Sequence, residues 1–253
     1  AQGELAMWST YLAWSLINAG LPYWAAFIIT VVVSFFFGVA IERVLIRRVE
    51  SAPVLTVVIV FIGMQFILNS LAGWVFGYTI QQFPSPFPED PPFDNPYINS
   101  HELGIVGVTF LVVTLLWAFF RFTPAGLALR GAAANGESAG LCGIRVGSML
   151  ALGWGLASAI GAVAGMLIAP VVFLDPNMMG GILIYAFAAA LMGGIDSPVG
   201  AVLGGFLLGV LENLAGAYVI GTELKLTVAL VTIVTVLVVK PSGLFGKVVV
   251  TRV

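Results

Sequence analysis

The chain has 253 residues, of which 60 % are hydrophobic and only 9 % are charged, with a formal net charge of −2 and a mean hydropathy of +1.09. Soluble globular domains carry about 25 % charged residues, so this composition excludes a soluble domain and predicts an integral membrane protein. The single cysteine, Cys142, excludes an intrachain disulfide and any zinc or redox motif of paired cysteines. The opening AQGELAM has no initiator Met and no basic leader, so we expect a trimmed start rather than a signal peptide.

Apolar runs predict an all-α, polytopic membrane helical bundle with about eight membrane segments, at residues 5–18, 22–41, 54–76, 103–120, 146–169, 180–195, 199–219 and 224–239. Most approach the ~20 residues that a helix needs to cross the hydrocarbon core. The first and sixth segments are the weakest. Residues 5–41 carry no charge and are too long for one span, so the sequence Asn18-Ala-Gly-Leu-Pro22 predicts a turn between two helices.

The basic residues predict the orientation, because loops rich in Lys and Arg remain cytoplasmic. If the spans alternate, one side receives nine of the ten basic residues, namely Arg43, Arg47, Arg48, Arg121, Arg130, Arg145, Lys240, Lys247 and Arg252. Lys225 is the exception. The loop 78–102 has no Lys or Arg and contains Glu89, Asp90, Asp94, Glu102 and six prolines. We therefore expect an external, extended and stiff loop there, and a cytoplasmic C-terminus.

The sixth segment is too short for a simple crossing. The stretch between Gly181 and Gly193 makes roughly 17 Å of helix at 1.5 Å per residue, whereas the core is ~30 Å thick. A re-entrant segment would place the basic tail outside, against the charge rule. We therefore expect a short helix preceded by non-helical backbone from Asp175 to Gly181, which is tolerated at membrane depth only where protein buries it or it lines a cavity. A tilted short helix is the alternative.

The segment 121–145, RFTPAGLALRGAAANGESAGLCGIR, is polar and rich in small residues, and it separates two long apolar runs. It predicts two short helices from these signals: a cap at Thr123, Pro124 at the first helical position, an interruption at Asn135-Gly136, a second turn from Glu137 to Cys142, and a left-handed stop at Gly143. Small side chains let a partner backbone approach, while Arg130 and Glu137 supply register. The pattern predicts a cytoplasmic docking element, with an ordinary amphipathic loop helix as the alternative.

Small residues recur every four positions in two segments and predict close helix packing, within the chain or in a dimer. They are Gly153, Ala157, Gly161 and Gly165 in one segment, and the pairs Gly200/Gly204 and Gly205/Gly209 in the other.

Few polar side chains fall inside the predicted spans. Glu212, with Asn213 beside it, is either a substrate or ion contact or a structural carboxyl that bonds a neighbouring helix. Gln65 and Asn69 share one helical face and either line a polar path or bond across helices. Glu4 is expected at the interface or within the bundle. His101, which has no second imidazole for a metal site, is expected to be a solvated loop residue.

Catalytic motifs are absent from the sequence, which has no GxxxxGK[ST], HExxH, nucleophile elbow or dinucleotide fingerprint. We therefore expect no enzyme, no metal and no cofactor, and any ATP hydrolysis must occur on another subunit. An ion-coupled secondary transporter remains a rival, although Glu212 alone supplies a mid-span carboxylate. A membrane enzyme and a purely structural subunit are further alternatives.

Several motifs occur in order along almost the whole chain: LALRGAAANGESAGLCGIRV, GAVAGML, DPNMMGG, AFAAALMGGIDSPVGAVLGGFLLGVLEN and KPSGLFG. Together they resemble the permease subunit of branched-chain amino-acid ABC importers. The opening AQGELAM also matches that family, in which a first helix and an Asn-Phe pair precede it. Amide and urea importers share these motifs, so the substrate is an open choice between amino acids and these compounds.

The resemblance implies a single transmembrane permease domain over residues 1–253 of a bacterial inner-membrane importer. It implies a second, similar permease, two cytoplasmic ATPase subunits and an external substrate-binding protein as partners, with no nucleic acid. It makes the segment 121–145 the coupling helix that contacts an ATPase, through Leu129, Arg130, Ala132, Ala139, Gly143 and Ile144. Gly131 and Gly136 depart from the family pattern, and these departures concern the continuity of this helix and not its docking role.

Overall fold

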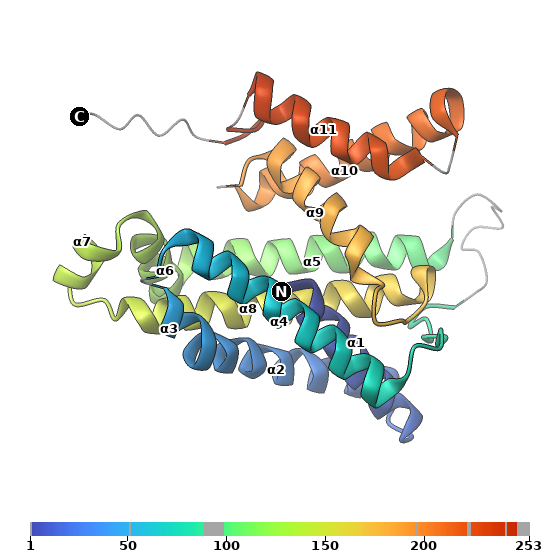
Figure 1. The fold of residues 1–253 in the computed structure, drawn as a ribbon, viewed down its shortest axis with the longest axis horizontal. Coiled ribbons are helices and arrows are strands. Elements are labelled where there is room, and N and C mark those ends of the chain that lie inside the picture. Colours follow the sequence, from blue (N-terminus) through green and yellow to red (C-terminus); the bar gives the residue numbers. More distant parts are fainter. Residues whose placement is uncertain are drawn as a thin grey trace. The chain divides into compact units, whose positions relative to one another are not determined.

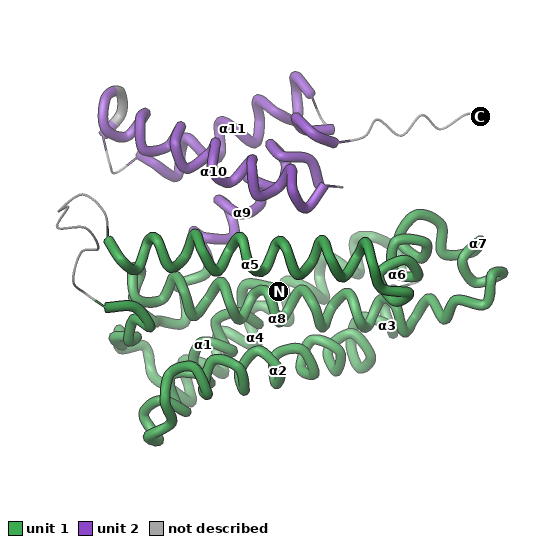
Figure 2. The backbone as a smooth tube through the Cα atoms, turned by 180° about the vertical axis from the view of Figure 1, so that it is seen from behind, with its two compact units in different colours: residues 1–179 green, residues 180–253 purple. Residues whose placement is uncertain are grey.

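The computed structural model of the chain describes residues 2–50, 52–88, 99–195, 197–221, 224–240 and 242–246. These residues divide into two compact units, residues 1–179 and 180–253, which Figure 1 shows as ribbons and Figure 2 distinguishes by colour. Lys247, Arg252 and the acidic, Pro-rich part of the loop 78–102 that contains Glu89, Asp90 and Asp94 lie outside the described residues. The single permease domain stays a prediction.

The described residues form a helical protein, which confirms the predicted all-α class. Unit 1 contains the long helices α1 (Gln2–Asn18), α2 (Tyr23–Ile41), α4 (Val54–Phe76), α5 (Ser100–Phe122) and α8 (Val146–Val172). Its short elements are the π-helical turn η1 (Glu42–Ile46), α3 (Arg47–Val49), α6 (Pro124–Ala134) and α7 (Gly136–Leu141). Helix α9 (Met179–Gly193) starts at the unit boundary, and unit 2 continues with α10 (Pro198–Ala215), the π-helical turn η3 (Gly216–Ile220) and α11 (Lys225–Val239). Each predicted apolar segment therefore corresponds to a helix.

Five helices in the described parts of the chain are long and apolar enough to cross a membrane, at Tyr23–Val49, Val54–Phe76, Ser100–Phe122, Val146–Val172 and Pro198–Tyr218. Two shorter apolar helices are Met179–Gly193 and Lys225–Val239. The predicted polytopic membrane bundle is confirmed.

Helix α8 is the centre of unit 1, because its small residues let α1 and α2 pack closely against it. Gly161 lies beside Ala6 of α1, and a Cβ atom at Gly165 would lie 3.0 Å from the Ala6 carbonyl oxygen. On the side facing α2, a Cβ atom at Gly155 would come within 2.8 Å of Val39. The predicted ridge of small residues therefore packs within the chain at Gly161 and Gly165, and Gly155, which was not part of the prediction, adds the contact with α2.

The contacts of α8 also fix the direction and level of its neighbours. Ala6 lies beside Gly161 and Thr10 beside Gly165, so α1 runs parallel to α8. Gly38 faces Ser158, and Ser34 Oγ donates to Ser9 Oγ at 2.7 Å, so α2 runs antiparallel to both. Because Ala6 is level with Gly161, the first turn of α1 lies beside the middle of α8.

The chain between α8 and α9 is non-helical from Phe173 to Met178. Phe173 has a φ of 65°, and Leu174 pairs with Gln81 through two hydrogen bonds of 2.9 Å. The expected non-helical break from Asp175 to Gly181 is therefore confirmed, but its predicted end at Gly181 is wrong, since α9 already starts at Met179. An Asx turn explains the early start, because the Asp175 carboxylate accepts from the Asn177 amide at 2.6 Å. With 15 residues, α9 is about 22 Å long.

His101 corrects another expectation, because it is buried rather than solvated. The Asn99 side chain caps α5 by accepting from the His101 amide at 3.0 Å, so this histidine lies in the first helical turn. Its Nε2 is 2.9 Å from the Leu167 carbonyl oxygen, and its Nδ1 is 2.9 Å from Ser85 Oγ. His101 therefore attaches the described end of the 78–102 loop to α8.

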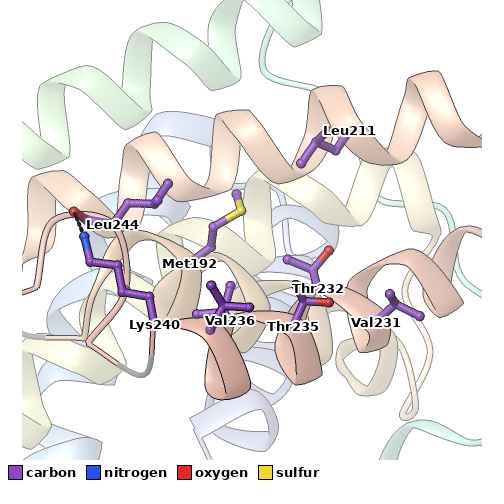
Figure 3. Close-up of a pocket in the computed structure, with 10 residues that line it drawn as sticks. Met192, Leu211, Val231, Thr232, Thr235, Val236, Lys240 and Leu244 are labelled. Carbon is purple, nitrogen blue, oxygen red and sulfur yellow. Dashed lines mark hydrogen bonds between the residues drawn. The ribbon is translucent and has the colours of Figure 1, made fainter.

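Unit 2 packs its own helices through glycines, as predicted for Gly200 and Gly204. A Cβ atom at either position would collide with the backbone of α9, at Gly193 or Ala189. After α11 the chain returns to the same helix end, where the Leu244 amide donates to the Met192 carbonyl at 2.8 Å. An apolar cavity of about 320 Å³ lies beside this return (Figure 3) and is lined by Met192, Leu211, Val231, Thr232, Thr235, Val236, Val239, Lys240, Gly243 and Leu244.

Candidate functional site

The segment 121–145 folds into two consecutive short helices, α6 and α7, as its signals predict. Thr123 Oγ1 accepts from the Gly126 amide at 3.0 Å, and Pro124 occupies the first position of α6. The Asn135 side chain then caps α7 by accepting from the Ser138 amide at 2.9 Å. Gly143 has a φ of 83°, the left-handed geometry that glycine adopts without steric cost. Helix α7 ends at Leu141, one residue earlier than expected.

The predicted docking residues divide between two faces of this segment. Arg130 and Gly143 are exposed, as is Glu137. The remaining residues face the chain's own helices or are partly covered: Ala139 is buried, and Leu129, Ala132 and Ile144 are half-buried. Leu129 lies against Gly153 of α8, so the inner face holds the segment while the outer face is free for a partner.

Leu141 is a feature that the sequence analysis did not single out. Its side chain is 91 % exposed at the end of α7, next to the exposed thiol of Cys142. A single exposed leucine is common on a protein surface. This one is of interest because it lies on the same segment as Arg130. The signal that could have found it is its position two residues before the left-handed Gly143, where no further turn of helix can cover it.

A charged clamp joins the end of α2 to the start of α8, next to the segment 121–145. Arg47 donates from Nε and Nη2 to the two carboxylate oxygens of Glu42, each at 3.2 Å, and Nη2 also donates to the Gly147 carbonyl. The Glu42 side chain is 1 % exposed, whereas that of Arg47 is 43 % exposed. Gly147 follows Arg145 by two residues, so the clamp fixes α2 to the start of α8 where the docking segment ends.

Gln65 and Asn69, predicted to share a face of α4, have different surroundings. Gln65 is exposed. Asn69 is half-buried, and its Nδ2 donates to the Pro176 carbonyl at 2.7 Å and to Asn177 Oδ1 at 3.1 Å. Asn69 therefore bonds across to the non-helical break between α8 and α9, one of the two roles expected for it.

Glu212 and Asn213 lie in α10 of unit 2, and each has a polar neighbour that the sequence analysis did not connect with it. The Tyr185 hydroxyl is in hydrogen-bonding reach of the half-buried Glu212 carboxylate. Lys225 Nζ donates to Asn213 Oδ1 at 2.9 Å. Lys225, the one basic residue outside the predicted cytoplasmic set, thus lies beside the acid-bearing turn of α10.

Metal chemistry has no support in the described ranges, which contain no group of three or more His, Cys, Asp and Glu side chains that could hold an ion. The polar groups described above instead belong to hydrogen-bonded clusters of the apolar helices or to the segment 121–145, which lies between α5 and α8. This arrangement defines a multi-pass membrane protein.

Comparison with known proteins identifies the family. Residues 1–239 match the family described as branched-chain amino acid transport system / permease component, and the chain belongs to it. As a permease component it is a non-catalytic transmembrane subunit of an ABC transport system, as the sequence predicts.

Relatives resemble the chain along nearly its whole length. It is 32 % identical to the high-affinity branched-chain amino acid transport system permease protein LivH of Escherichia coli K12, and 32 % identical to the corresponding protein BraD of Pseudomonas aeruginosa; both alignments cover 98 % of this chain and 85 % of the relative. A probable branched-chain amino acid transport permease protein LivH of Methanocaldococcus jannaschii is 26 % identical over 97 % of this chain and 82 % of its own length. No solved structure matches the chain significantly.

Proposed function

We propose that the chain is the membrane subunit through which an ATP-binding-cassette importer moves branched-chain or similar small amino acids across the bacterial inner membrane. The observation that carries this proposal is the family match over residues 1–239, to which curated amino acid permeases add identity along 98 % of the chain. Leu129, Arg130 and their neighbours lie in a capped helical segment with one attached face and one exposed face, which suits a subunit that receives force from outside the membrane.

The importer contains further subunits in this proposal: a second permease of the same family, two cytoplasmic ATPases and an external substrate-binding protein. The segment 121–145 docks on an ATPase, with the C-terminus on the same, cytoplasmic side. Arg130 and Gly143 lie on the exposed face and contact the ATPase directly. Ala132 and Ile144 are half-buried, so they support the segment together with Leu129 and Ala139.

The translocation pathway takes its polar lining from Gln65, Asn69, Glu212 and Asn213 in this proposal. Each lies on a helix that is long and apolar enough to span the membrane, and a polar group there is costly unless it has a partner or faces a cavity. Closure of the ATPases pushes the docking segment, and the helices attached to it then open the pathway alternately to each side.

Charge reversal of Arg130 tests the docking role. Arg130 is exposed and makes no hydrogen bond or ion pair with any residue that the structure describes, so Arg130→Glu leaves the fold intact. Juxtaposing like charges in an interface costs several kcal/mol, and we expect ligand-stimulated ATP hydrolysis and uptake in reconstituted complexes to fall at least about tenfold. Arg48→Glu, at an exposed position in α3 outside the segment 121–145, is the matched control. Normal stimulation in Arg130→Glu contradicts the docking role.

An amide or urea importer of the same family is the alternative substrate class, and uptake assays with labelled leucine, urea and short amides separate them. An ion-coupled secondary transporter is the rival mechanism. It predicts uptake by this chain alone in vesicles that lack ATP, whereas the importer proposal predicts none.

A further inference from the structure

Two buried polar atoms on α1 have no partner among the described residues. Glu4 is 6 % exposed and Tyr11 is fully buried, yet Glu4 Oε2 and the Tyr11 hydroxyl form no hydrogen bond there. The two residues are seven apart, which is about two helical turns, so they lie on one face of α1. Buried polar groups are nearly always satisfied, so this pair needs a bonding group beyond those that the described residues provide.

The same face of α1 looks onto α4. Trp8, which lies between the two residues, donates from Nε1 to the Leu68 carbonyl at 2.9 Å. The Tyr11 ring stacks on Phe76 with ring centroids 4.4 Å apart, and the Glu4 carboxyl is in hydrogen-bonding reach of Asn69. The first turn of α1 is level with the middle of α8, so the Glu4 carboxyl lies near the middle of the span.

The break between α8 and α9 adds oxygen atoms to the same place. Asn69 Nδ2 donates to the Pro176 carbonyl and to Asn177 Oδ1, so this amide nitrogen holds the break beside α1 rather than satisfying Glu4 Oε2. The charge of Asp175 is close enough to act on Tyr11. Pro176 is buried, whereas Asp175 is half-buried and Asn177 is exposed. We define the Glu4 cluster as Glu4, Tyr11, Asn69, Asp175, Pro176 and Asn177. It is exposed at Asn177 and buried at Glu4.

The chemistry of this cluster selects its ligand. Helices α1 and α4 and residues 173–178 contain two acidic side chains, Glu4 and Asp175, and no Lys, Arg or His. The polar atoms are mainly acceptors: carboxylate, amide and main-chain carbonyl oxygens. A carboxylate at membrane depth favours a ligand that brings positive charge and N–H donors together. A primary ammonium group has three such donors and one positive charge.

We propose that the Glu4 cluster binds the ammonium group of the transported amino acid as it passes through the membrane. The inference rests on the proposed function and names a part of the substrate that this chain recognises. Glu4 Oε2 accepts one N–H bond and carries the countercharge, the Tyr11 oxygen accepts a second, and the oxygens of the break accept the third. The carboxylate and side chain of the amino acid lie toward the open, Asn177 end.

Binding to the intact complex in lipid nanodiscs, without the external binding protein, tests the inference. Equilibrium binding of tritiated L-leucine is measured at millimolar concentrations. We expect displacement by 3-methylbutan-1-amine, which keeps the ammonium group, and none by 4-methylpentanoate, which lacks it. If sodium chloride displaces leucine and potassium chloride at equal ionic strength does not, the cluster is an inorganic-cation site and the proposal is overturned. The absence of leucine binding to the wild type overturns it as well.

Glu4→Gln keeps the shape of the side chain and removes its charge, so we expect leucine binding to weaken at least about tenfold. Glu102→Gln, the same change at an exposed acid in the first turn of α5, is the matched control and binds as the wild type does. If Glu4→Gln fails to assemble, Tyr11→Phe removes one hydroxyl while keeping the stacked ring, and is expected to weaken binding at least about threefold. Unchanged affinity in the assembled variant overturns the inference.

Uptake by the complete system separates this failure from that of the proposed function. If the wild type does not take up labelled leucine when its binding protein is present, the proposed substrate is wrong. If the wild type takes up leucine and Glu4→Gln takes it up equally well, the proposed function stands and the ammonium site alone is refuted.

Discussion

Replacing Arg47 with methionine removes the clamp between α2 and α8 while keeping an unbranched side chain of similar length. In the wild type, the guanidinium makes two hydrogen bonds of 3.2 Å to Glu42 and a third to the Gly147 carbonyl. The Glu42 carboxylate is 1 % exposed, so water does not replace the lost partner without a structural change. The variant therefore leaves a buried charge unpaired at the end of α2.

The size of the effect follows from the burial of the two partners. Removing one side of a fully buried ion pair costs about 3–5 kcal/mol. Arg47 is 43 % exposed, so solvent screens part of its attraction to Glu42, and we expect a loss of ~2 kcal/mol. For a protein of this size, this lowers the unfolding temperature by about 4–8 °C.

Thermal unfolding of the complex in nanodiscs measures this loss, with Arg48→Met as the control because Arg48 is the next residue and is exposed. A second substitution sharpens the test. Adding Glu42→Gln to Arg47→Met removes the unpaired charge and is expected to restore about 1 kcal/mol, which a double-mutant cycle detects as coupling. Equal unfolding temperatures for Arg47→Met and Arg48→Met, or no recovery in the double variant, refute the clamp.

Two further predictions concern packing and orientation. Gly165→Ala places a Cβ atom 3.0 Å from the Ala6 carbonyl oxygen and still closer to Thr10, so we expect thermal unfolding to show a loss of stability of about 1–3 kcal/mol. In the control Gly161→Ala, the nearest contact is an ordinary 3.4 Å, and we expect a change within about 0.5 kcal/mol. Equal effects of the two substitutions contradict the packing of α1 on α8. The exposed thiol of Cys142 is expected to react with a membrane-impermeant maleimide only from the cytoplasmic side of vesicles of known orientation, and labelling from the external side contradicts the proposed topology.

Local signals in the sequence predict the helices and their ends well, because these depend on neighbouring residues. The apolar runs, the cap at Thr123 and the stop at Gly143 each act within about one turn of the chain. The predicted break before α9 rests on the length that a span requires, and its end was misplaced by three residues. There, the Asx turn of Asp175 starts the helix before the glycines.

Side-chain environments that depend on distant segments are not predictable in this way. His101 was expected to be solvated, but its imidazole contacts the Leu167 carbonyl 66 residues later in the chain. Glu4 was left between the membrane interface and the bundle; it is buried and lies near Asn69, which in turn bonds to Pro176. Nothing near Glu4 in the sequence shows that these segments meet it.

Helix α8 connects the docking segment to the Glu4 cluster, and this connection gives the two proposals a common mechanism. Its first residues follow the docking segment directly and are clamped to α2 through Gly147, while its glycines hold α1 closely along the middle of the span. Its last residue leads directly into the break that Asn69 holds against α1.

Because closely packed helices move as a body, a push on the docking segment shifts α1, α2 and α8 together. The contacts of Asn69 with Pro176 and Asn177, which join α4 to the break, are then the ones that must change. We therefore infer that release of the ammonium group from Glu4 accompanies the loss of these contacts. Asn69→Leu is then expected to weaken leucine binding, while the loss of stability that Arg47→Met causes in thermal unfolding stays the same.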